Sequence, residues 1–532
     1  MKTVKIEGTV TRIGEEAFAY CNKLTSINLK EGLEYIEGSA FHGDSSLSSL
    51  TLPSTIIHIG DYAFAYCTSL KKLTIPSGVT TINYGTFMEC QKLTTIAIPE
   101  SVTTIKSYAF SNCSKLENLV LPSKLTTLEA YSLSGLSSIK TLELPSTIKN
   151  VAEGTFSSCS KLTTITLPEK LTKIPANLFD GCTSLTEIKI PETVTAIENG
   201  AFNNCYQLDE ITIPNSVTTI GNNAFNSCTR ITKITLPKKL TYLGSGAFAN
   251  CTSLKSINIP STLSAIEENT FDHCRSLTSI EIPEGVKVVD NYAFYYCANL
   301  TDISFAESIE TIGSNAFTGT KWIQLAEEDH MVITDNGILI KYTGTDTNLT
   351  IPDNVTSIAS NVFRNNSYLT KVIVPDSVVT INNSAFRNCS NLSSIKLSST
   401  LASIGNDVFQ DCLSLTVMKL PSSIKSIGSY AFENCQNLKT VNLPNSITYI
   451  GKGAFFNCTA LEEVTLPTKL TRLERNVFSY CTNLKKLTIP ANVTSVDSNC
   501  ITTYNMSPVI YCAKDSAAYD FAMSKGLKVE VY

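Results

Sequence analysis

Cysteine is the residue type in this sequence with the most obvious potential for chemistry. Sixteen of the 18 cysteines recur at multiples of 23 residues, from Cys21 to Cys481. Such a series could form disulfides or supply thiolates to zinc. If equivalent residues stack in adjacent coils, however, they lie about 4.8 Å apart, whereas the Cβ atoms of a disulfide lie roughly 3.5–4.5 Å apart. A straight column also cannot converge tetrahedrally on a metal ion. We therefore expect free, buried, structural thiols.

Cys500 and Cys512 do not belong to this series. They lie near the C-terminus, where the spacing of the other cysteines has ended. A disulfide between them is one interpretation, and two further buried thiols are the other.

Two short segments contain residue types that are used in catalysis or metal binding. The tripeptide Asp272-His273-Cys274 contains the groups of a nucleophilic site, but Cys274 belongs to the cysteine series and should point into the core. The acidic run Glu327-Glu328-Asp329 lacks the spaced oxygens and the turn glycine of a calcium loop. The four histidines are far apart, and no phosphate-binding glycine motif is present. We therefore expect no catalytic residue, no metal site and no cofactor, and a protein that is not an enzyme.

The cysteines are one part of a repeat that fills almost the whole chain. A phenylalanine recurs every 23 residues from Phe18 to Phe317, with Leu133 as the one substitution, and again from Phe363 to Phe478. Counted from this anchor, the repeat is A-F-x-x-C-x-x-L-x-x-I-x-L-P-x-x-V-T-x-I. One such unit cannot bury its own apolar residues, so the units must stack and bury them against one another. The 532 residues should therefore form a solenoid rather than several globular domains.

The stretch LTTITLP, residues 162–168, indicates how each repeat folds. Ile165 and Leu167 alternate with threonines, which is the period of a strand with one buried face, and Pro168 ends the strand because it lacks a backbone donor. The V-T-x-I that follows should turn the chain across the end of the coil. The G-x-x-A-F segment should form a short helical turn on the return side. Parallel pairing between coils predicts a curved, β-rich solenoid.

The recurring I-G-x-x-A-F-x-x-C-x-x-L-x-x-I-x-L-P-x-x-V-T-x-I, as in residues 59–82 and 220–243, resembles the BspA-like class of leucine-rich repeats. The resemblance covers nearly the whole chain. It implies an α/β leucine-rich-repeat solenoid, a horseshoe or shallow arc with a parallel β-sheet on its concave face and short helical or irregular segments on its convex side. It also implies a surface-exposed or secreted protein that mediates adhesion to host proteins or other cells.

One departure from the family pattern concerns location. The first residues, MKTVKIEGTVTRIGEEAF, lack the apolar core of a signal peptide, and no surface anchor is evident. An intracellular protein–protein interaction scaffold is therefore the alternative, and unpaired thiols would suit it.

Residues 318–351 interrupt the repeat. They contain the only tryptophan, Trp322, and the stretch MVITDNGILIKY, which predicts a β-hairpin with its turn at residues 335–337. A structural insert is the default interpretation, and a specific contact site is the alternative.

The end of the chain also departs from the repeat. It predicts a strand at 509–511, an amphipathic helix at 516–525 and a closing strand at 527–532. The expected organisation is therefore a repeat array over 1–317, the hairpin segment over 318–351, a continued array over 352–504 and a C-terminal cap over 505–532.

The composition and the sheet face restrict the class of partner. The formal net charge of −5 argues against binding to nucleic acid, and no stretch is long and apolar enough to span a membrane. The variable positions of the predicted face lie seven, eight and ten residues after each anchor, where serine and threonine dominate, which favours weak multivalent contacts. We expect a monomer that binds a protein or a cell-surface ligand. The candidate partner-binding residues are Lys71, Lys72, Asp209, Glu210, Trp322, Lys485 and Lys486.

Tyrosines cluster beside the anchor instead, as in Tyr62 with Tyr66 and Tyr292 with Tyr295 and Tyr296. These positions should lie on the return side of the coil. Packing against a neighbouring coil is one interpretation, and a secondary contact patch is the other.

Overall fold

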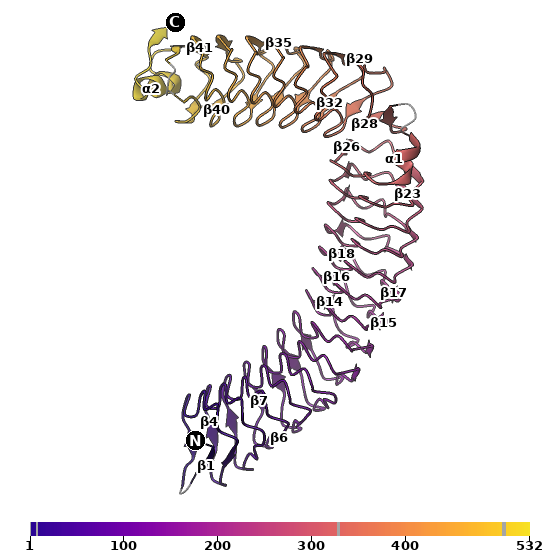
Figure 1. Ribbon diagram of the computed structural model, residues 1–532, viewed down its shortest axis with the longest axis vertical. Helices are drawn as coiled ribbons and strands as arrows, with labels where there is room; N and C mark the ends of the chain where they lie inside the picture. Colours follow the sequence, from indigo (N-terminus) through magenta and orange to yellow (C-terminus); the bar gives the residue numbers. More distant parts are fainter. Residues whose placement is uncertain (1, 7–8, 327–329, 503–506) are drawn as a thin grey trace. The chain divides into compact units, whose positions relative to one another are not determined.

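The computed structural model describes residues 2–6, 9–326, 330–502 and 507–532. The chain folds as two compact units. Unit 1 comprises Met1–Val286, Tyr292–Ile303 and Phe317–Trp322, and unit 2 comprises Lys287–Asn291, Ser304–Ala316 and Ile323–Tyr532. Within each unit a 23-residue repeat forms one coil, and consecutive coils stack side by side (Figure 1).

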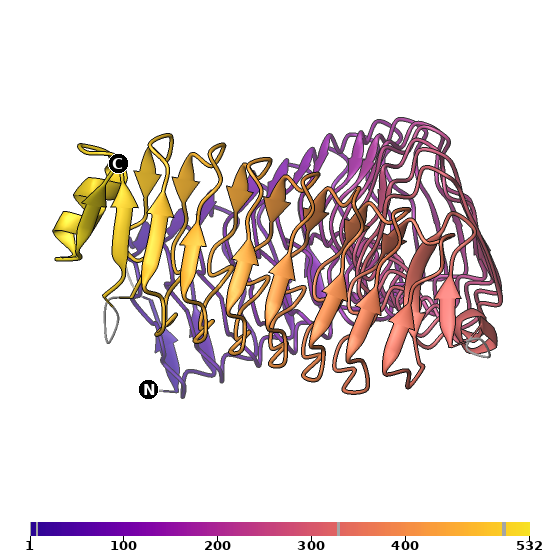
Figure 2. The same ribbon diagram turned by 90° about the horizontal axis from the view of Figure 1, so that it is seen from above.

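A regular coil contributes two short strands, which form separate columns along each unit (Figure 2). We call them the IxL strands and the TxI strands, after the part of the repeat in which they lie. The IxL strands confirm the predicted period of two, since their burial alternates exposed, buried, exposed, as in Lys72–Thr74. The TxI strands correct the expectation that V-T-x-I only turns the chain. That segment is extended because its Ile enters the core while its backbone pairs with the neighbouring coil, as Thr104 and Ile105 do with Thr127 and Leu128.

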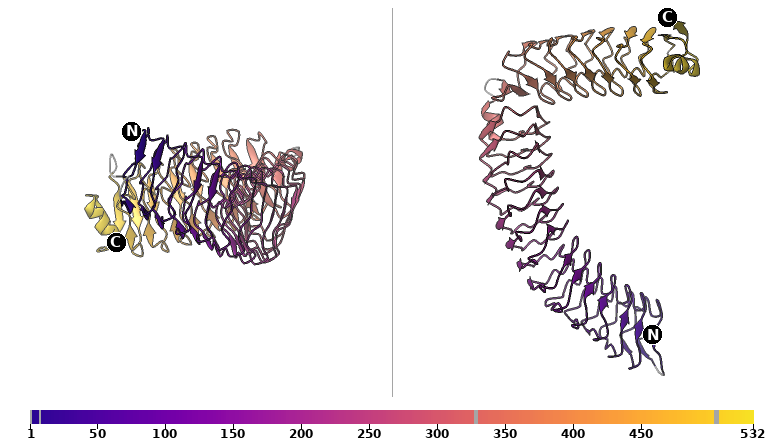
Figure 3. Two further views of the ribbon diagram at one scale, coloured as in Figure 1. Left: turned by 90° about the horizontal axis from the view of Figure 1, so that it is seen from below. Right: turned by 180° about the vertical axis from the view of Figure 1, so that it is seen from behind.

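In unit 1 the two columns lie on different sides of the stack, as Figure 3 shows from behind. The IxL strands of unit 1 are β1 (Thr3–Lys5), β3 (Ser26–Asn28), β6 (Lys72–Thr74), β8 (Thr95–Ala97), β11 (Thr141–Leu142), β13 (Thr164–Ile165), β15 (Glu187–Lys189), β17 (Glu210–Thr212), β19 (Lys233–Ile234), β21 (Ser256–Ile257) and β23 (Ser279–Ile282). Its TxI strands are β2 (Arg12–Ile13), β4 (Tyr35–Ile36), β5 (His58–Ile59), β7 (Thr81–Ile82), β9 (Thr104–Ile105), β10 (Thr127–Leu128), β12 (Asn150–Val151), β14 (Lys173–Ile174), β16 (Ala196–Ile197), β18 (Thr219–Ile220), β20 (Tyr242–Leu243) and β22 (Ala265–Ile266).

Unit 2 repeats this arrangement. Its IxL strands are β29 (Asn348–Thr350), β31 (Lys371–Ile373), β33 (Ser394–Lys396), β35 (Val417–Lys419), β37 (Thr440–Asn442), β39 (Glu463–Thr465) and β41 (Lys486–Ile489). Its TxI strands are β24 (Val288–Val289), β26 (Thr311–Ile312), β30 (Ser357–Ile358), β32 (Thr380–Ile381), β34 (Ser403–Ile404), β36 (Ser426–Ile427), β38 (Tyr449–Ile450), β40 (Arg472–Leu473) and β42 (Ser495–Val496). β25 (Asp302–Phe305) contains residues of both units.

The G-x-x-A-F segment, for which a short helical turn was predicted, is an irregular run of tight turns. Its backbone is left-handed two residues before and two residues after the anchor, as at Tyr62 (φ 55°) and Tyr66 (φ 60°). Because of this alternation, the N–H groups of Tyr62, Phe64 and Tyr66 donate to carbonyls of the next coil at 2.7–2.9 Å, while the intervening N–H groups donate within the coil. In the interior of an α-helix each N–H group would instead donate to the carbonyl four residues earlier in the same coil. The turns thus add a third ladder of hydrogen bonds between coils, which offsets the cost of left-handed non-glycine residues.

The core of each unit is a stack of anchor phenylalanines. Phe225 is fully buried, and its ring centroid lies 5.2 Å from those of Phe202 and Phe248, with the rings nearly parallel. At the end of one run, Trp322 packs edge-on against Phe317 at 5.4 Å. Trp322 lies in α1 (Lys321–Ala326), a helix that the sequence analysis did not predict.

The predicted hairpin is confirmed in unit 2. β27 (Met331–Ile333) pairs antiparallel with β28 (Ile338–Tyr342), and β28 continues in parallel to β30. The hairpin therefore joins the TxI column, so it is integrated into the stack. The acidic run 327–329 lies outside the described residues.

The strand, helix and strand that were predicted for the C-terminal segment are present. They are β43 (Val509–Cys512), α2 (Ala517–Ser524) and β44 (Val529–Val531), and β43 pairs in parallel with both β41 and β44. Ser516 caps α2 by accepting a hydrogen bond from the Tyr519 N–H. Within the described residues, neither helix has the length and apolar character that crossing a bilayer requires.

Candidate partner-binding surface

The cysteine column confirms the structural interpretation of the thiols. Every cysteine is unpaired, Cys500 and Cys512 included, and all except Cys21 are buried. In the regular coils the thiol donates to the anchor carbonyl of the preceding coil, as Cys251 Sγ does to Phe225 O at 3.2 Å. Burial raises the pKa of Cys251 to about 12, so the thiol stays protonated and unreactive.

The tripeptide 272–274 does not assemble a nucleophilic site. His273 Nδ1 lies 2.5 Å from Asp272 Oδ1, on the outside of the coil, whereas Cys274 is fully buried and donates to Phe248 O. Burial raises the pKa of Cys274 well above its ordinary value. Among the described residues, no group of three or more His, Cys, Asp or Glu side chains is arranged to hold a metal ion.

One residue breaks the cysteine column with a charged side chain. Asp44 occupies the cysteine position of its coil and has no exposed surface. Among the described residues, no donor meets the geometry of a hydrogen bond to either carboxyl oxygen. Burial raises the pKa of Asp44 to about 7. The nearby backbone N–H of Cys21 has a smaller, opposite effect on this pKa, because it favours the carboxylate form. Asp44 is therefore an internal titratable group, which the sequence analysis overlooked because it sought only the cysteines of the column.

The surface that can meet a partner is formed by the outward side chains of the IxL strands, which we call the IxL face. These side chains are exposed on both sides of each buried Ile or Leu, as Glu187 and Lys189 are around Ile188 in β15. Strands pair at a constant offset of 23 residues, so equivalent side chains form rows across the coils. The face is thus ordered by the backbone, and its chemistry varies from coil to coil.

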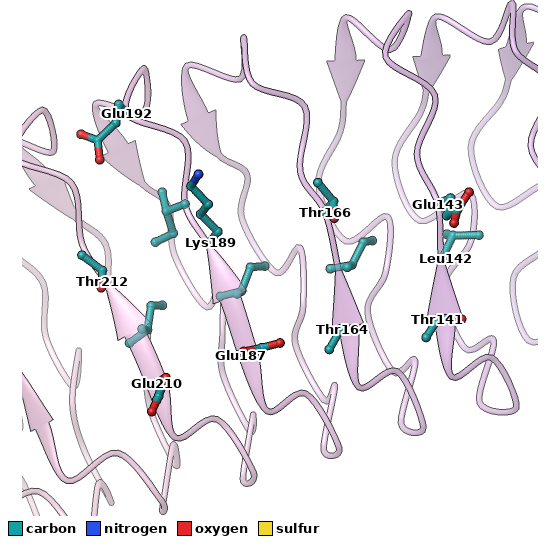
Figure 4. Close-up of a pocket in the computed structure, with 14 residues that line it drawn as sticks. Thr141, Leu142, Glu143, Thr164, Thr166, Glu187, Lys189, Glu192, Glu210 and Thr212 are labelled. Atoms are coloured by element: carbon teal, nitrogen blue, oxygen red, sulfur yellow. The ribbon is translucent and has the colours of Figure 1, made fainter.

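One depression on the IxL face lies in unit 1, across β11, β13, β15 and β17. We call it the acidic hollow. It has a volume of about 810 Å³ and is lined by threonines, by the carboxylates of Glu143, Glu187, Glu192 and Glu210, and by the ammonium group of Lys189. Figure 4 shows these side chains distributed over adjacent strands and the loop that carries Glu192.

The two central carboxylates of the hollow are direct neighbours. Glu187 and Glu210 are register partners in the parallel pair of β15 and β17. Both side chains are exposed. No ion pair neutralises either of them among the described residues. Like charges at directly opposed positions of a sheet are destabilising.

Two predicted pairs of binding residues lie in unit 1 and are placed differently. Glu210 lines the acidic hollow, while its neighbour Asp209 lies 3.7 Å from Arg230. Lys72 lines a separate hollow of about 330 Å³ with Thr74 and Thr95, and Lys71 is exposed just before β6. Trp322 is half-buried against Phe317 and lies outside both hollows.

The third predicted pair lies in unit 2. Lys485 forms an ion pair with Glu462 at 2.7 Å, and the Nζ of Lys486 lies 4.6 Å from the ring centre of Tyr511. These two ammonium groups are already engaged within the protein.

Sequence reasoning missed Glu143, Glu187, Lys189 and Glu192. The first three lie eight or ten residues after an anchor, and the sequence analysis had marked those positions as variable. Comparing the charges of neighbouring coils would have revealed the acidic enrichment. The hollow itself has no signal in the sequence.

The tyrosines beside the anchor pack on neighbouring coils. The Tyr62 ring covers Gly85, where an added Cβ would lie 2.6 Å from the ring, and Tyr131 covers Gly154 in the same way at 2.1 Å. Both glycines have positive φ. This arrangement supports the packing interpretation for Tyr62.

The comparison with known families gives one extended match. A family model described as BspA type leucine rich repeat region (6 copies) matches residues 1–117, 103–232, 218–332, 341–423 and 402–525. No curated protein matches the chain.

The similar solved structures include bacterial leucine-rich repeat proteins. One from Bacteroides ovatus is 27% identical with a TM-score of 0.36, and the alignment covers 66% of this chain and 88% of that chain. One from T. pallidum is 28% identical with a TM-score of 0.29, covering 38% and 94% respectively. A leucine rich cell surface protein from Faecalibacterium prausnitzii is 23% identical with a TM-score of 0.24, covering 92% and 87%. These TM-scores are low, so family membership rests on the family model.

Proposed function

Because this chain belongs to the family of BspA-type leucine-rich repeat proteins, we propose that it is a non-catalytic recognition protein that binds partners through its IxL face. Proteins of this family are generally protein-binding or surface proteins. The proposed setting is the cell surface or the extracellular medium. The proposed partners are host proteins or proteins on other cells, bound by a monomer.

The observation that supports this proposal most directly is the IxL face. Its strands keep one register through successive coils, so polar side chains such as Thr74, Thr95 and Thr212 are presented in ordered rows. The thiols, by contrast, lie in the core. A rigid, polar, extended face with inert surroundings suits binding rather than chemistry, because catalysis requires reactive groups that converge on one point. Such a face gains affinity from many weak contacts.

An intracellular interaction scaffold is the second candidate. The unpaired state of every cysteine favours it, because reduced thiols persist in the cytosol, whereas disulfides form in oxidising compartments. In both candidate functions the partner binds to the IxL face. The two differ in whether the partner is outside or inside the cell.

Antibody labelling of intact, unpermeabilised cells of the source organism tests the location. We expect clear surface signal, with permeabilised cells as the reference for total protein. Signal that appears only after permeabilisation would contradict the surface proposal and would favour the scaffold.

A further inference from the structure

Charge distinguishes the acidic hollow from two other depressions of the IxL face. The hollow around Lys72 in unit 1 has no carboxylate in its lining. A hollow of about 490 Å³ in unit 2 is lined by Lys396 and Lys419, again without a carboxylate. The acidic hollow has four carboxylates and one ammonium group in its lining, on the IxL strands and the segments that follow them. The fold therefore determines where depressions can form. The variable residues determine the charge of each lining, and so which charge a bound partner must carry.

The lining of the acidic hollow carries four carboxylates and one ammonium group, and Lys233, which follows Glu210 in the same row one coil further on, lies outside the lining. Glu187 and Glu210 face each other across one strand pair, and their repulsion is largest when no cation lies between them. The single ammonium group of the lining, on Lys189, extends from the other end of β15, toward the side where Thr212 lies (Figure 4). A bound cation at the Glu187 end would remove this repulsion, so the hollow complements a positively charged occupant.

We propose that the acidic hollow binds a lysine- or arginine-rich segment of a partner protein in an extended conformation. This inference rests on the proposed function of the IxL face as the partner surface, and it names the chemistry of the partner.

The spacing of the carboxylates favours an extended segment over a compact cation. Adjacent coils lie about 4.8 Å apart, so Glu187 and Glu210 are one coil apart, whereas Glu143 lies two coils and two strand positions from Glu187, at roughly 12 Å. Alternate side chains of an extended peptide repeat every 6–7 Å or so, and two basic side chains could therefore reach carboxylates on different coils. Thr164 and Thr166, which line the hollow between these carboxylates, offer hydroxyl groups to a peptide backbone. A single metal ion would need ligands that converge, and the described residues provide no such group.

Fluorescence anisotropy with a labelled octapeptide of alternating arginine and threonine tests the proposal on the full chain. We expect saturable binding that weakens about tenfold in the double variant Glu187→Gln/Glu210→Gln, because two charge-assisted contacts are lost. Binding should also weaken between 50 and 150 mM salt, since exposed charges are screened more strongly. Thermal unfolding of the variant should occur at the same or a higher temperature, because the substitutions remove a repulsion and leave the core intact.

The matched control is the double variant Glu34→Gln/Glu463→Gln. Both side chains are exposed, neither lines the hollow, and the change in net charge is the same. We expect its affinity for the peptide to stay within about twofold of the unmodified protein, as exposed charges that do not contact the peptide are screened. Equal losses in the two variants would overturn the proposal, because net charge alone would then explain binding.

Two further probes distinguish the alternatives. A labelled octapeptide of alternating glutamate and threonine should not bind, and binding equal to that of the arginine peptide would overturn the proposal. Spermine that competes as tightly as the arginine peptide would overturn the extended-segment assignment in favour of a small-cation site. Absence of any binding would overturn the proposal too, whereas the surface labelling described above would be unaffected, so the two failures are distinguishable.

Discussion

Replacement of Asp44 by cysteine should stabilise the first coils of unit 1 at neutral and alkaline pH. In the next coil, Cys67 Sγ donates to Phe41 O at 3.2 Å. By the same repeat, the group at Asp44 faces the anchor carbonyl of Phe18. A protonated carboxyl group can donate to a carbonyl, but a carboxylate cannot. Asp44→Cys restores the donor that the repeat provides elsewhere and removes a buried charge.

The magnitude follows from the pKa of Asp44. Burial raises it from an ordinary value of 3.8 to about 7. Because the raised value belongs to the folded state, ionisation costs nothing below pH 3.8, costs progressively more up to pH 7, and costs a constant amount above pH 7. One pKa unit corresponds to about 1.4 kcal/mol, so the full cost is roughly 4 kcal/mol. The first coils are covered by neighbours mainly on one side, and relaxation toward water reduces the expected cost to roughly 2–4 kcal/mol.

Hydrogen–deuterium exchange measures this effect locally, since coils of a solenoid open in part of the array. Peptides that cover residues 18–67 should show equal protection in the two proteins at pH 4. At pH 8 protection should be roughly 30- to 1,000-fold greater in Asp44→Cys, which is the factor that corresponds to 2–4 kcal/mol. The two proteins are compared with each other at the same pH. The intrinsic exchange rate of the amides, which depends on pH, is therefore the same in both and does not affect the ratio.

Equal protection of the two proteins at pH 8 would refute the reasoning. A difference that is independent of pH would also refute it, because the effect would then come from packing and not from ionisation. Peptides from residues 386–478 provide the internal control and should be unchanged. The reverse substitution, Cys228→Asp, should introduce the same pH dependence into the middle of unit 1, since Cys228 is fully buried and donates to Phe202 O.

Three other substitutions or reactions test the packing. Phe225→Ala should cost roughly 3–5 kcal/mol in denaturant unfolding because it empties a fully buried site between two stacked rings, and unchanged unfolding would contradict that packing. Gly154→Ala should cost roughly 1–3 kcal/mol, since residue 154 has φ +60° and its Cβ would lie 2.1 Å from the Tyr131 ring. Gly14→Ala, with nothing within 4 Å of its Cβ and no positive φ, is the control and should change stability by less than about 0.5 kcal/mol. A thiol reagent should react in the native protein at Cys21, which is partly exposed, and at the other cysteines only after denaturation; rapid reaction of most thiols would contradict the buried column.

Much of the fold could be predicted from the sequence because the period is strict. The 23-residue recurrence of phenylalanine, cysteine and proline identified the coil, the IxL strand and the buried thiols. The hairpin at 331–342 and the cap at 509–531 were also predicted, because each carries local signals such as a turn glycine or a helix cap. These features depend on residues close together in the chain.

The missed features depend on the neighbouring coil. Thr81–Ile82 is too short to show a strand period, and it is a strand because the next coil pairs with it. The left-handed residue Tyr62 looks like part of a helical turn, and it is held in its conformation by a hydrogen bond to Tyr84 in the next coil. Interactions between coils decide both conformations, so local propensity could not reveal them.

By itself the sequence determined that the chain stacks, what fills the core and which positions face outward, because burial of repeated apolar residues allows only one arrangement. The tertiary structure alone decided which outward residues act together. It placed Glu187 directly opposite Glu210 in the lining of one open hollow, and it buried the Asp44 carboxyl where no well-formed hydrogen bond to a described residue satisfies it. The physical reason is that electrostatic repulsion, hollow volume and desolvation depend on distances between atoms of different coils, and a repeat period fixes only which residues are equivalent.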